Sequence, residues 1–298
     1  FLPFLPLLER TGWRDDEKLT VAVSLSILTL YLYSFAVYLL SVPTWSFYGL
    51  AAIAVAFSFY RFRAILRVLR DPGVRETLIL WLVVNVWLLL LLCLIKSYSG
   101  GEWYFDWLRH YQKSLVFFRQ LPPDVMPDLP SRPPLMNLIP APFFALSGDE
   151  FPVYQQLYTL LNSLVLLPLL LLGRVLCGAK RLLIPSAAVI CCNPMFIQNA
   201  TYSWTKLLTV FFLLAALYFY IRGVQVDNRY FLPASSILLG LSLLTHYSAV
   251  PYFFAFAGHY CLYLFWRQRN RWRQLIWCCA PSLLLFVAWF AWAVGTYG

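Results

Sequence analysis

The sequence has 298 residues, of which 61% are hydrophobic and only 12% are charged, and its mean hydropathy is +0.68. A soluble domain cannot cover so much apolar surface, so the composition excludes one and predicts an all-α polytopic membrane protein. The net charge of +10 is then expected to reflect membrane topology and contact with anionic lipids. It does not predict a nucleic-acid-binding protein.

Apolar segments long enough, or nearly long enough, to cross a bilayer recur along the chain. A helix needs about 17 to 25 apolar residues to cross the hydrocarbon core. The pattern predicts about nine spans, of which the second and eighth are the shortest: Leu19–Val42, Thr44–Tyr60, Leu78–Ile95, Val153–Leu172, Leu182–Ala200, Tyr202–Ile221, Tyr230–Val250, Pro251–Trp266 and Leu275–Tyr297.

The lysines and arginines predict the orientation of these spans. With nine crossings, 17 of the 23 basic residues fall on the same side as the N-terminus. By the positive-inside rule that side is cytoplasmic, and the long loop 96–152 lies outside. The expected location is the cytoplasmic (inner) membrane of a bacterium, with the loop in the periplasm.

The basic connector Arg61–Glu76 divides the chain into residues 1–76, with two spans, and residues 77–298, with seven spans and the loop. The seven cysteines include no Cys-x-x-Cys pair and are expected to be packing residues. Because the sequence lacks an initiator Met and stops just after a predicted span, we expect it to belong to a longer product.

The loop 96–152 is too long and too rich in aromatic residues for a simple connector. Its first part predicts an amphipathic helix at the membrane interface. The apolar face comprises Trp103, Trp107, Tyr111, Leu115 and Phe118. The other face gathers Glu102, Asp106, Arg109, His110 and Lys113, which can alternatively form only ordinary helical ion pairs.

Four ionisable residues are predicted to meet at the outer mouth of the bundle. Prolines hold the segment around Arg132 in an extended conformation. The guanidinium of Arg132 can bind a phosphate, or it can simply extend to the membrane interface as a snorkelling arginine. Lys206 and His246 each lie about one turn inside a predicted helix at the same depth. With Asp106 they form a candidate site, although Lys206 alone can snorkel and His246 alone can be a packing residue.

The order of several loop and helix motifs resembles the GT-C polyprenyl-phosphate-sugar glycosyltransferases, in the branch of protein O-mannosyltransferases and aminoarabinose transferases. The resemblance covers roughly Leu78 to Gly298. It is carried by Gly101-Glu-Trp-Tyr-Phe-Asp106, Arg132-Pro-Pro-Leu135, Gly148-Asp-Glu150, Asn193-Pro194, Tyr202-Ser-Trp-Thr-Lys206 and Gly240-Leu-Ser-Leu-Leu-Thr-His246-Tyr-Ser248.

This resemblance implies sugar transfer from a lipid-linked phosphosugar at the outer face. Asp106, or second Glu102, matches the family's acidic residue that acts as general base or orients the acceptor. Arg132 and Lys206 would stabilise the leaving phosphate, and His246, Tyr247, Gln156 and His110 would be sugar or phosphate contacts.

The sequence requires no cofactor. The polyprenyl-phosphate sugar is the expected donor substrate, and a divalent metal is neither required nor excluded. Expected partners are membrane lipids, the lipid-linked sugar and proteins of a membrane complex. Two other classes stay open: a catalytically silent relative or accessory subunit of such a complex, and a lipid or sugar transporter.

Overall fold

A computed structural model describes residues 1–298 except 96–103, 178–182, 227, 268–271 and 298. Its regular elements within those ranges are all helical, which agrees with the predicted fold class. The α-helices are α1 (Asp15–Leu39), α2 (Ser46–Tyr60), α3 (Phe62–Leu69), α4 (Pro72–Leu94), α5 (Tyr104–Phe118), α6 (Leu135–Leu138), α7 (Pro140–Ser147), α8 (Phe151–Ser163), α9 (Leu166–Cys177), α10 (Leu183–Cys192), α11 (Pro194–Thr201), α12 (Thr205–Gln225), α13 (Phe231–Thr245), α14 (Val250–Arg267) and α15 (Trp272–Tyr297).

Five of the described helical segments are long and apolar enough to cross a membrane, fewer than the nine expected spans. They are Asp15–Leu39, Pro72–Leu94, Phe151–Leu176, Thr205–Gln225 and Arg273–Tyr297. A sixth arises if α2 and α3, bent by 78° relative to each other, count as one span. The chain is therefore built as a polytopic membrane protein.

Two of the expected spans are shortened by identifiable residues. The segment Leu182–Ala200 breaks into α10 and α11, because Asn193 caps α11 through the backbone N–H groups of Met195 and Phe196 and Pro194 follows it. The segment Tyr230–Val250 ends as an α-helix at Thr245, because His246 is extended (φ −159°, ψ 133°). Apolar composition alone predicted both segments as longer helices.

The core of the bundle is formed by α12, α13 and α15 together with α1, α8 and α9. Helices α13 and α15 approach closely at Gly240, where an added Cβ would lie 3.0 Å from the Cα of Ser282. The Ser282 hydroxyl donates a 2.6 Å hydrogen bond to the carbonyl of Ser236 nearby. Buried α1 residues such as Leu19 and Ile27 belong to the same cluster, so α1 packs within one core with the later helices.

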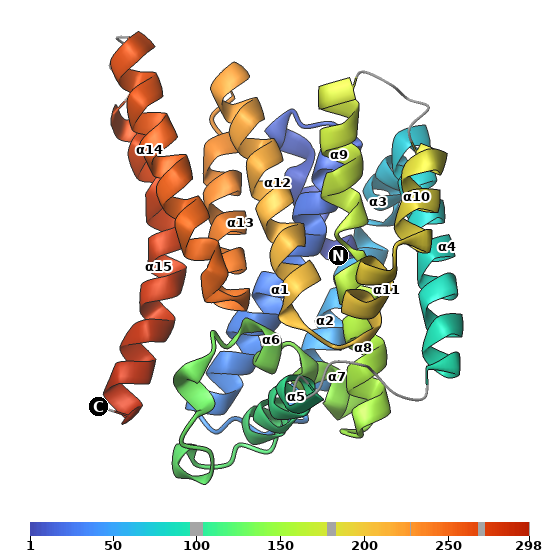
Figure 1. The fold of residues 1–298 in the computed structure, drawn as a ribbon, viewed down its shortest axis with the longest axis vertical. Helices are drawn as coiled ribbons and strands as arrows, with labels where there is room; N and C mark the ends of the chain where they lie inside the picture. The colour runs from blue at the N-terminus through green and yellow to red at the C-terminus, as the bar shows by residue number, and fades with distance from the viewer. Residues whose placement is uncertain (96–103, 178–182, 227, 268–271, 298) are drawn as a thin grey trace.

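The bundle has two chemically different ends (Figure 1). At one end α5, α6 and α7 lie across the helices, and we call this the loop end. The opposite end is called the arginine-rich end after Arg14, Arg61, Arg63, Arg67, Arg174 and Arg222. This separation places the predicted site and most of the basic connector at opposite ends.

Candidate functional site

Four residues predicted to converge lie together at the loop end. Asp106 lies in the first turn of α5, and its Oδ1 is 3.6 Å from Nη2 of Arg132. Nη1 of Arg132 lies 3.5 Å from Nε2 of His246, and Nζ of Lys206 lies 3.4 Å from the same nitrogen. The loop, α12 and the end of α13 thus supply one charged cluster, which we call the loop-end cluster: Asp106, Arg132, Lys206, His246 and Tyr247.

Arg132 is presented by an extended segment that α5 holds in place. Its backbone (φ −130°, ψ 145°) follows a short 3-10 turn, Leu129–Ser131. Lys113 of α5, only 1% exposed, donates hydrogen bonds to the carbonyl of Asp128 (2.6 Å) and the hydroxyl of Ser131 (2.8 Å). Arg109 binds the Asp128 carboxylate through two nitrogens. The turn before Arg132 is therefore tied at several points to the helix that carries Asp106.

These contacts also explain the pKa shifts of Lys113 and Asp128. Burial lowers the pKa of Lys113, although the neighbouring Asp128 opposes that effect. For Asp128, burial opposes the charged form, but the hydrogen bond from Arg109 and the charge of Lys113 outweigh it and lower the pKa. Asp128 is thus held as a carboxylate that neutralises part of the surrounding positive charge.

Lys206 and His246 lie at helix ends and not one turn inside helices as predicted. Lys206 is the second residue of α12, because Trp204 is extended (φ −102°, ψ 154°) and begins the helix late. Its Nζ lies 5.2 Å from the centre of the Trp204 ring, within the range of a cation–π contact. His246 follows α13 and caps the next turn by accepting the backbone N–H of Ser248 at Nδ1, 3.1 Å away.

His246 turns a further hydrogen-bond donor toward the cluster. The hydrogen bond from the Ser248 N–H to Nδ1 assigns the proton of the neutral imidazole to Nε2, the nitrogen that faces Arg132 and Lys206. Burial, followed by the charges of Lys206 and Arg132, lowers the pKa of His246 to about 4. The Tyr247 hydroxyl accepts a 3.2 Å hydrogen bond from Arg132. The cluster therefore holds more donors and positive charge than its single carboxylate, Asp106, can match.

The remaining predicted site residues have other positions. His110 is buried on α5, and its Nδ1 lies 2.8 Å from Oδ1 of Asn137, while burial lowers its pKa to about 4. Its ring therefore packs against α6 and also lines the small polar cavity beside Asp106 and Arg132. Gln156 is exposed on α8, and within the described residues no hydrogen bond or ion pair joins it to the cluster. Glu102 lies outside the described residues.

The apolar face predicted for the loop helix is used for packing at Tyr111. Its ring centre lies 5.4 Å from those of both Phe151 and Tyr154 at the start of α8. His110 and Lys113 of α5 are also buried, whereas Asp106 is half-buried and Arg109 is exposed. Trp103, part of the predicted face, lies outside the described residues.

A small polar cavity of about 140 Å³ adjoins Asp106 and Arg132. The other residues that line it are Arg109, His110, Lys113, Asp128 and Ser131. A cavity of this size admits several water molecules or a small polar group. A hydroxyl entering it would come within reach of the Asp106 carboxylate.

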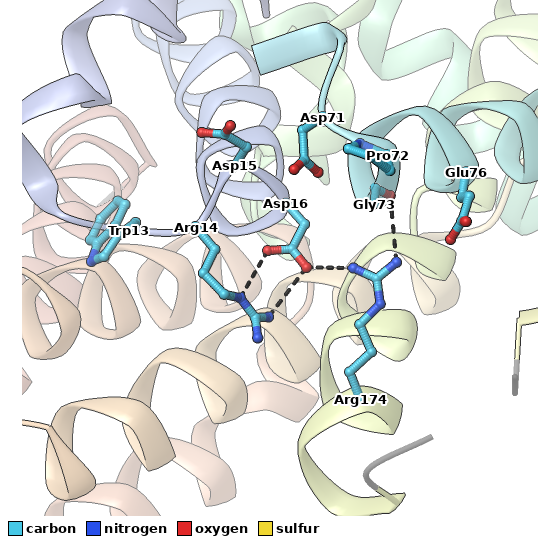
Figure 2. Close-up of a pocket in the computed structure, with 9 residues that line it drawn as sticks. All are labelled: Trp13, Arg14, Asp15, Asp16, Asp71, Pro72, Gly73, Glu76 and Arg174. Carbon is cyan, nitrogen blue, oxygen red and sulfur yellow. Dashed lines mark hydrogen bonds and ion pairs between the residues drawn. The ribbon is translucent and has the colours of Figure 1, made fainter. Parts of the chain in front are cut away.

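A larger cavity, about 650 Å³, lies at the arginine-rich end, where α1, α4 and α9 meet (Figure 2). Asp16 accepts hydrogen bonds there from Arg14 and Arg174. Arg174 also donates to the carbonyl of Gly73 at 3.4 Å, which ties α9 to the start of α4. The next residue of α1, Glu17, is 1% exposed and accepts from the Tyr218 hydroxyl.

These acidic residues were not predicted as part of a site. Asp15, Asp16 and Glu17 form the first turn of α1, where carboxylates favour a helix N-terminus. The sequence pattern that could have indicated them is three consecutive acidic residues just before an apolar segment, at the end of the molecule where arginines gather. Asp15 pairs with Lys18, and Asp16 and Glu17 pair with arginines of the same molecule, so this cavity has the character of an internal ion-pair network that joins helices.

Within the described residues, no group of three or more His, Cys, Asp or Glu side chains is arranged to hold a metal ion. Residues 133–298, more than half of the chain, match the model of a protein family described as a domain of unknown function (DUF6311). The match begins directly after Arg132 and includes Lys206 and His246. No curated protein and no solved structure matches the chain.

Proposed function

We propose that this chain, which belongs to the DUF6311 family, is an integral membrane glycosyltransferase that moves a sugar from a polyprenyl-phosphate donor to an acceptor at its loop end. One observation carries the proposal: the guanidinium of Arg132 and the ammonium of Lys206 each lie within 3.5 Å of the His246 imidazole, and the guanidinium lies 3.6 Å from the Asp106 carboxylate. Such a surplus of donors is suited to a phosphate, and an adjacent carboxylate is suited to an acceptor hydroxyl.

In this mechanism the bond between the sugar's anomeric carbon and the phosphate oxygen breaks, and its electron pair stays on the phosphate. Arg132, Lys206 and the Nε2–H of His246 stabilise the departing negative charge. Asp106 accepts the proton of the acceptor hydroxyl as that oxygen bonds to the anomeric carbon. Its ion pair with Arg132, at 3.6 Å and partly exposed, is weak enough to open for the acceptor.

We propose further that the cluster lies on the outer face of the membrane and that a GT-C-like group of helices carries it, as the sequence predicts. Segregation of arginines to the opposite end supports an outer-face location of the cluster, in the periplasm of a bacterium. The GT-C-like module would comprise residues 77–298 and act on a donor that reaches the cluster from the surrounding membrane.

Sugar transfer by the purified protein tests the proposal, with a panel of radiolabelled polyprenyl-phosphate sugars and a matched pair of variants. Asp106→Asn is expected to lower the turnover rate by about 100-fold or more, the usual contribution of a general base. Asp124→Asn, in the same loop but outside the cluster, should leave the rate unchanged. Full activity of Asp106→Asn, Glu102→Gln and the double variant would contradict the assignment.

Variants of the basic residues and a transport assay distinguish sugar transfer from the other two functions. Binding of undecaprenyl phosphate that is lost in Arg132→Gln and Lys206→Gln, without turnover of any donor, would indicate a catalytically silent subunit. Movement of the lipid-linked sugar across proteoliposomes, without formation of a glycosylated product, would indicate a transporter.

A further inference from the structure

An apolar groove lies at the arginine-rich end, where α2 bends into α3. The groove encloses about 430 Å³ and is lined from α2 by Ala54, Val55 and Phe59 and from α3 by Phe62, Ile65 and Leu69. Its other wall is the N-terminal segment around Leu2. Because α2 and α3 meet at 78°, the groove begins beside the apolar helix α2 and ends where the chain bends into α3.

A cationic hollow of about 550 Å³ continues from this groove. Phe59 and Phe62 line both spaces, and Arg61, Arg63 and Arg67 surround the second one. Glu9 lies between two of these arginines, 3.4 Å from Nη2 of Arg61 and 3.5 Å from Nη1 of Arg67. The hollow thus has three arginines and one carboxylate in its lining, and the Arg63 side chain is exposed.

We propose that the groove and the hollow together bind one anionic phospholipid. An acyl chain would lie in the apolar groove, and the headgroup phosphate would bind the guanidinium groups of Arg63 and Arg67. A phospholipid fits both spaces, because its acyl chain would fill the groove and its phosphate would pair with the arginines. A free phosphate would leave the groove empty, and an apolar protein helix would leave the arginines without a counter-charge. The site lies at the end opposite the loop-end cluster and does not depend on the proposed transferase activity.

A lipid bound at this site would also stabilise the protein. Arg61, at the end of α2, and Arg67 of α3 both pair with Glu9 of the N-terminal segment, so a phosphate that binds Arg67 would add a contact where these three segments meet. Since exposed ion pairs contribute little by themselves, a lipid that bridges them is expected to raise the melting temperature.

Native mass spectrometry of the full chain in detergent tests the site, by titration with phosphatidylglycerol and phosphatidylcholine of identical acyl chains. We expect tighter binding of phosphatidylglycerol. The double variant Arg63→Gln/Arg67→Gln should weaken that binding by about 25-fold, since each arginine near a lipid headgroup contributes about fivefold. The control Arg75→Gln/Arg229→Gln removes the same charge from exposed positions at the same end and should change binding less than twofold.

A second pair of variants tests the groove itself. Ala54→Trp fills the groove and should weaken phosphatidylglycerol binding, whereas Ala52→Trp, on an exposed face of α2 outside the groove, should not. Equal affinity for the two lipids, equal losses in variant and control, or unchanged binding in Ala54→Trp would overturn the proposal. Displacement of the lipid by glycerol phosphate alone would show a headgroup site without an acyl groove and would overturn it too.

Discussion

His110 and His246 lie at the same end of the molecule in different surroundings. The pKa of each is lowered to about 4, mainly by burial. His110 is paired with Asn137 inside the packing of α5 and α6, whereas His246 faces Lys206 and Arg132. The pKa of His110 is therefore lowered by its burial beside Asn137, whereas His246 lies in direct contact with Arg132 and Lys206.

Stability at mildly acidic pH should depend on His110. Because the pKa of His110 falls from 6.5 to about 4 on folding, the unfolded chain binds more protons than the folded chain between pH 4 and pH 6.5. Stability is therefore complete above pH 6.5 and declines as the pH falls toward 4, by about 3 kcal/mol for this histidine alone. His110→Asn should reduce the difference in melting temperature between pH 7 and pH 4.5. An unchanged difference would contradict this assignment, whatever the absolute melting temperature of the variant.

At the scale of elements, the positions of helix ends decide the chemistry of the cluster. Trp204 starts α12 late and His246 ends α13 early, so Lys206 and His246 lie at the mouth of the bundle and not along helix walls. Buried polar contacts such as Ser236 with Ser282 then set how closely α13 and α15 pack. At Gly240 the two helices leave no room for a Cβ atom.

Gly240→Ala should destabilise the bundle, because the new Cβ would lie 2.9 Å from Cδ1 of Leu285 and 3.0 Å from the Cα of Ser282. Overpacking against backbone costs about 1 to 3 kcal/mol and lowers the melting temperature. Gly258→Ala on α14 is the matched control, since its Cβ would meet no atom within 4 Å and should be neutral or slightly stabilising. Equal melting temperatures for the two variants would exclude close packing at Gly240.

On the scale of the whole molecule, the separation of the two ends predicts a fixed orientation in the membrane. After replacement of the seven native cysteines, Asp124→Cys at the loop end should react with an impermeant maleimide on intact cells. Arg63→Cys should react only after permeabilisation. Labelling of both from one side would contradict the two-ended arrangement, and the reverse pattern would invert the proposed orientation.

Composition and hydropathy were sufficient to predict a polytopic, all-helical membrane protein, because the cost of burying unpaired backbone groups in lipid leaves few alternatives. They also placed Asp106, Arg132, Lys206 and His246 at one end, since helices of similar length return the chain alternately to the same two surfaces. Within the described residues five or six helical segments reach the length of a span, and two of the nine predicted spans are interrupted, because apolar composition does not reveal the breaks at Asn193 and His246.

The sequence by itself thus determined the class of protein, the helical content and the end at which the charged residues gather. Only the tertiary structure decided which of them touch: His110 packs on Asn137, Gln156 is exposed, and Asp16 pairs with Arg14 and Arg174. The physical reason is the difference in distance scale. Hydropathy is a property of a whole segment, whereas an ion pair or a hydrogen bond requires that two groups lie within about 3 to 4 Å of each other. Such contacts depend on helix ends and on chain turns that no local pattern specifies.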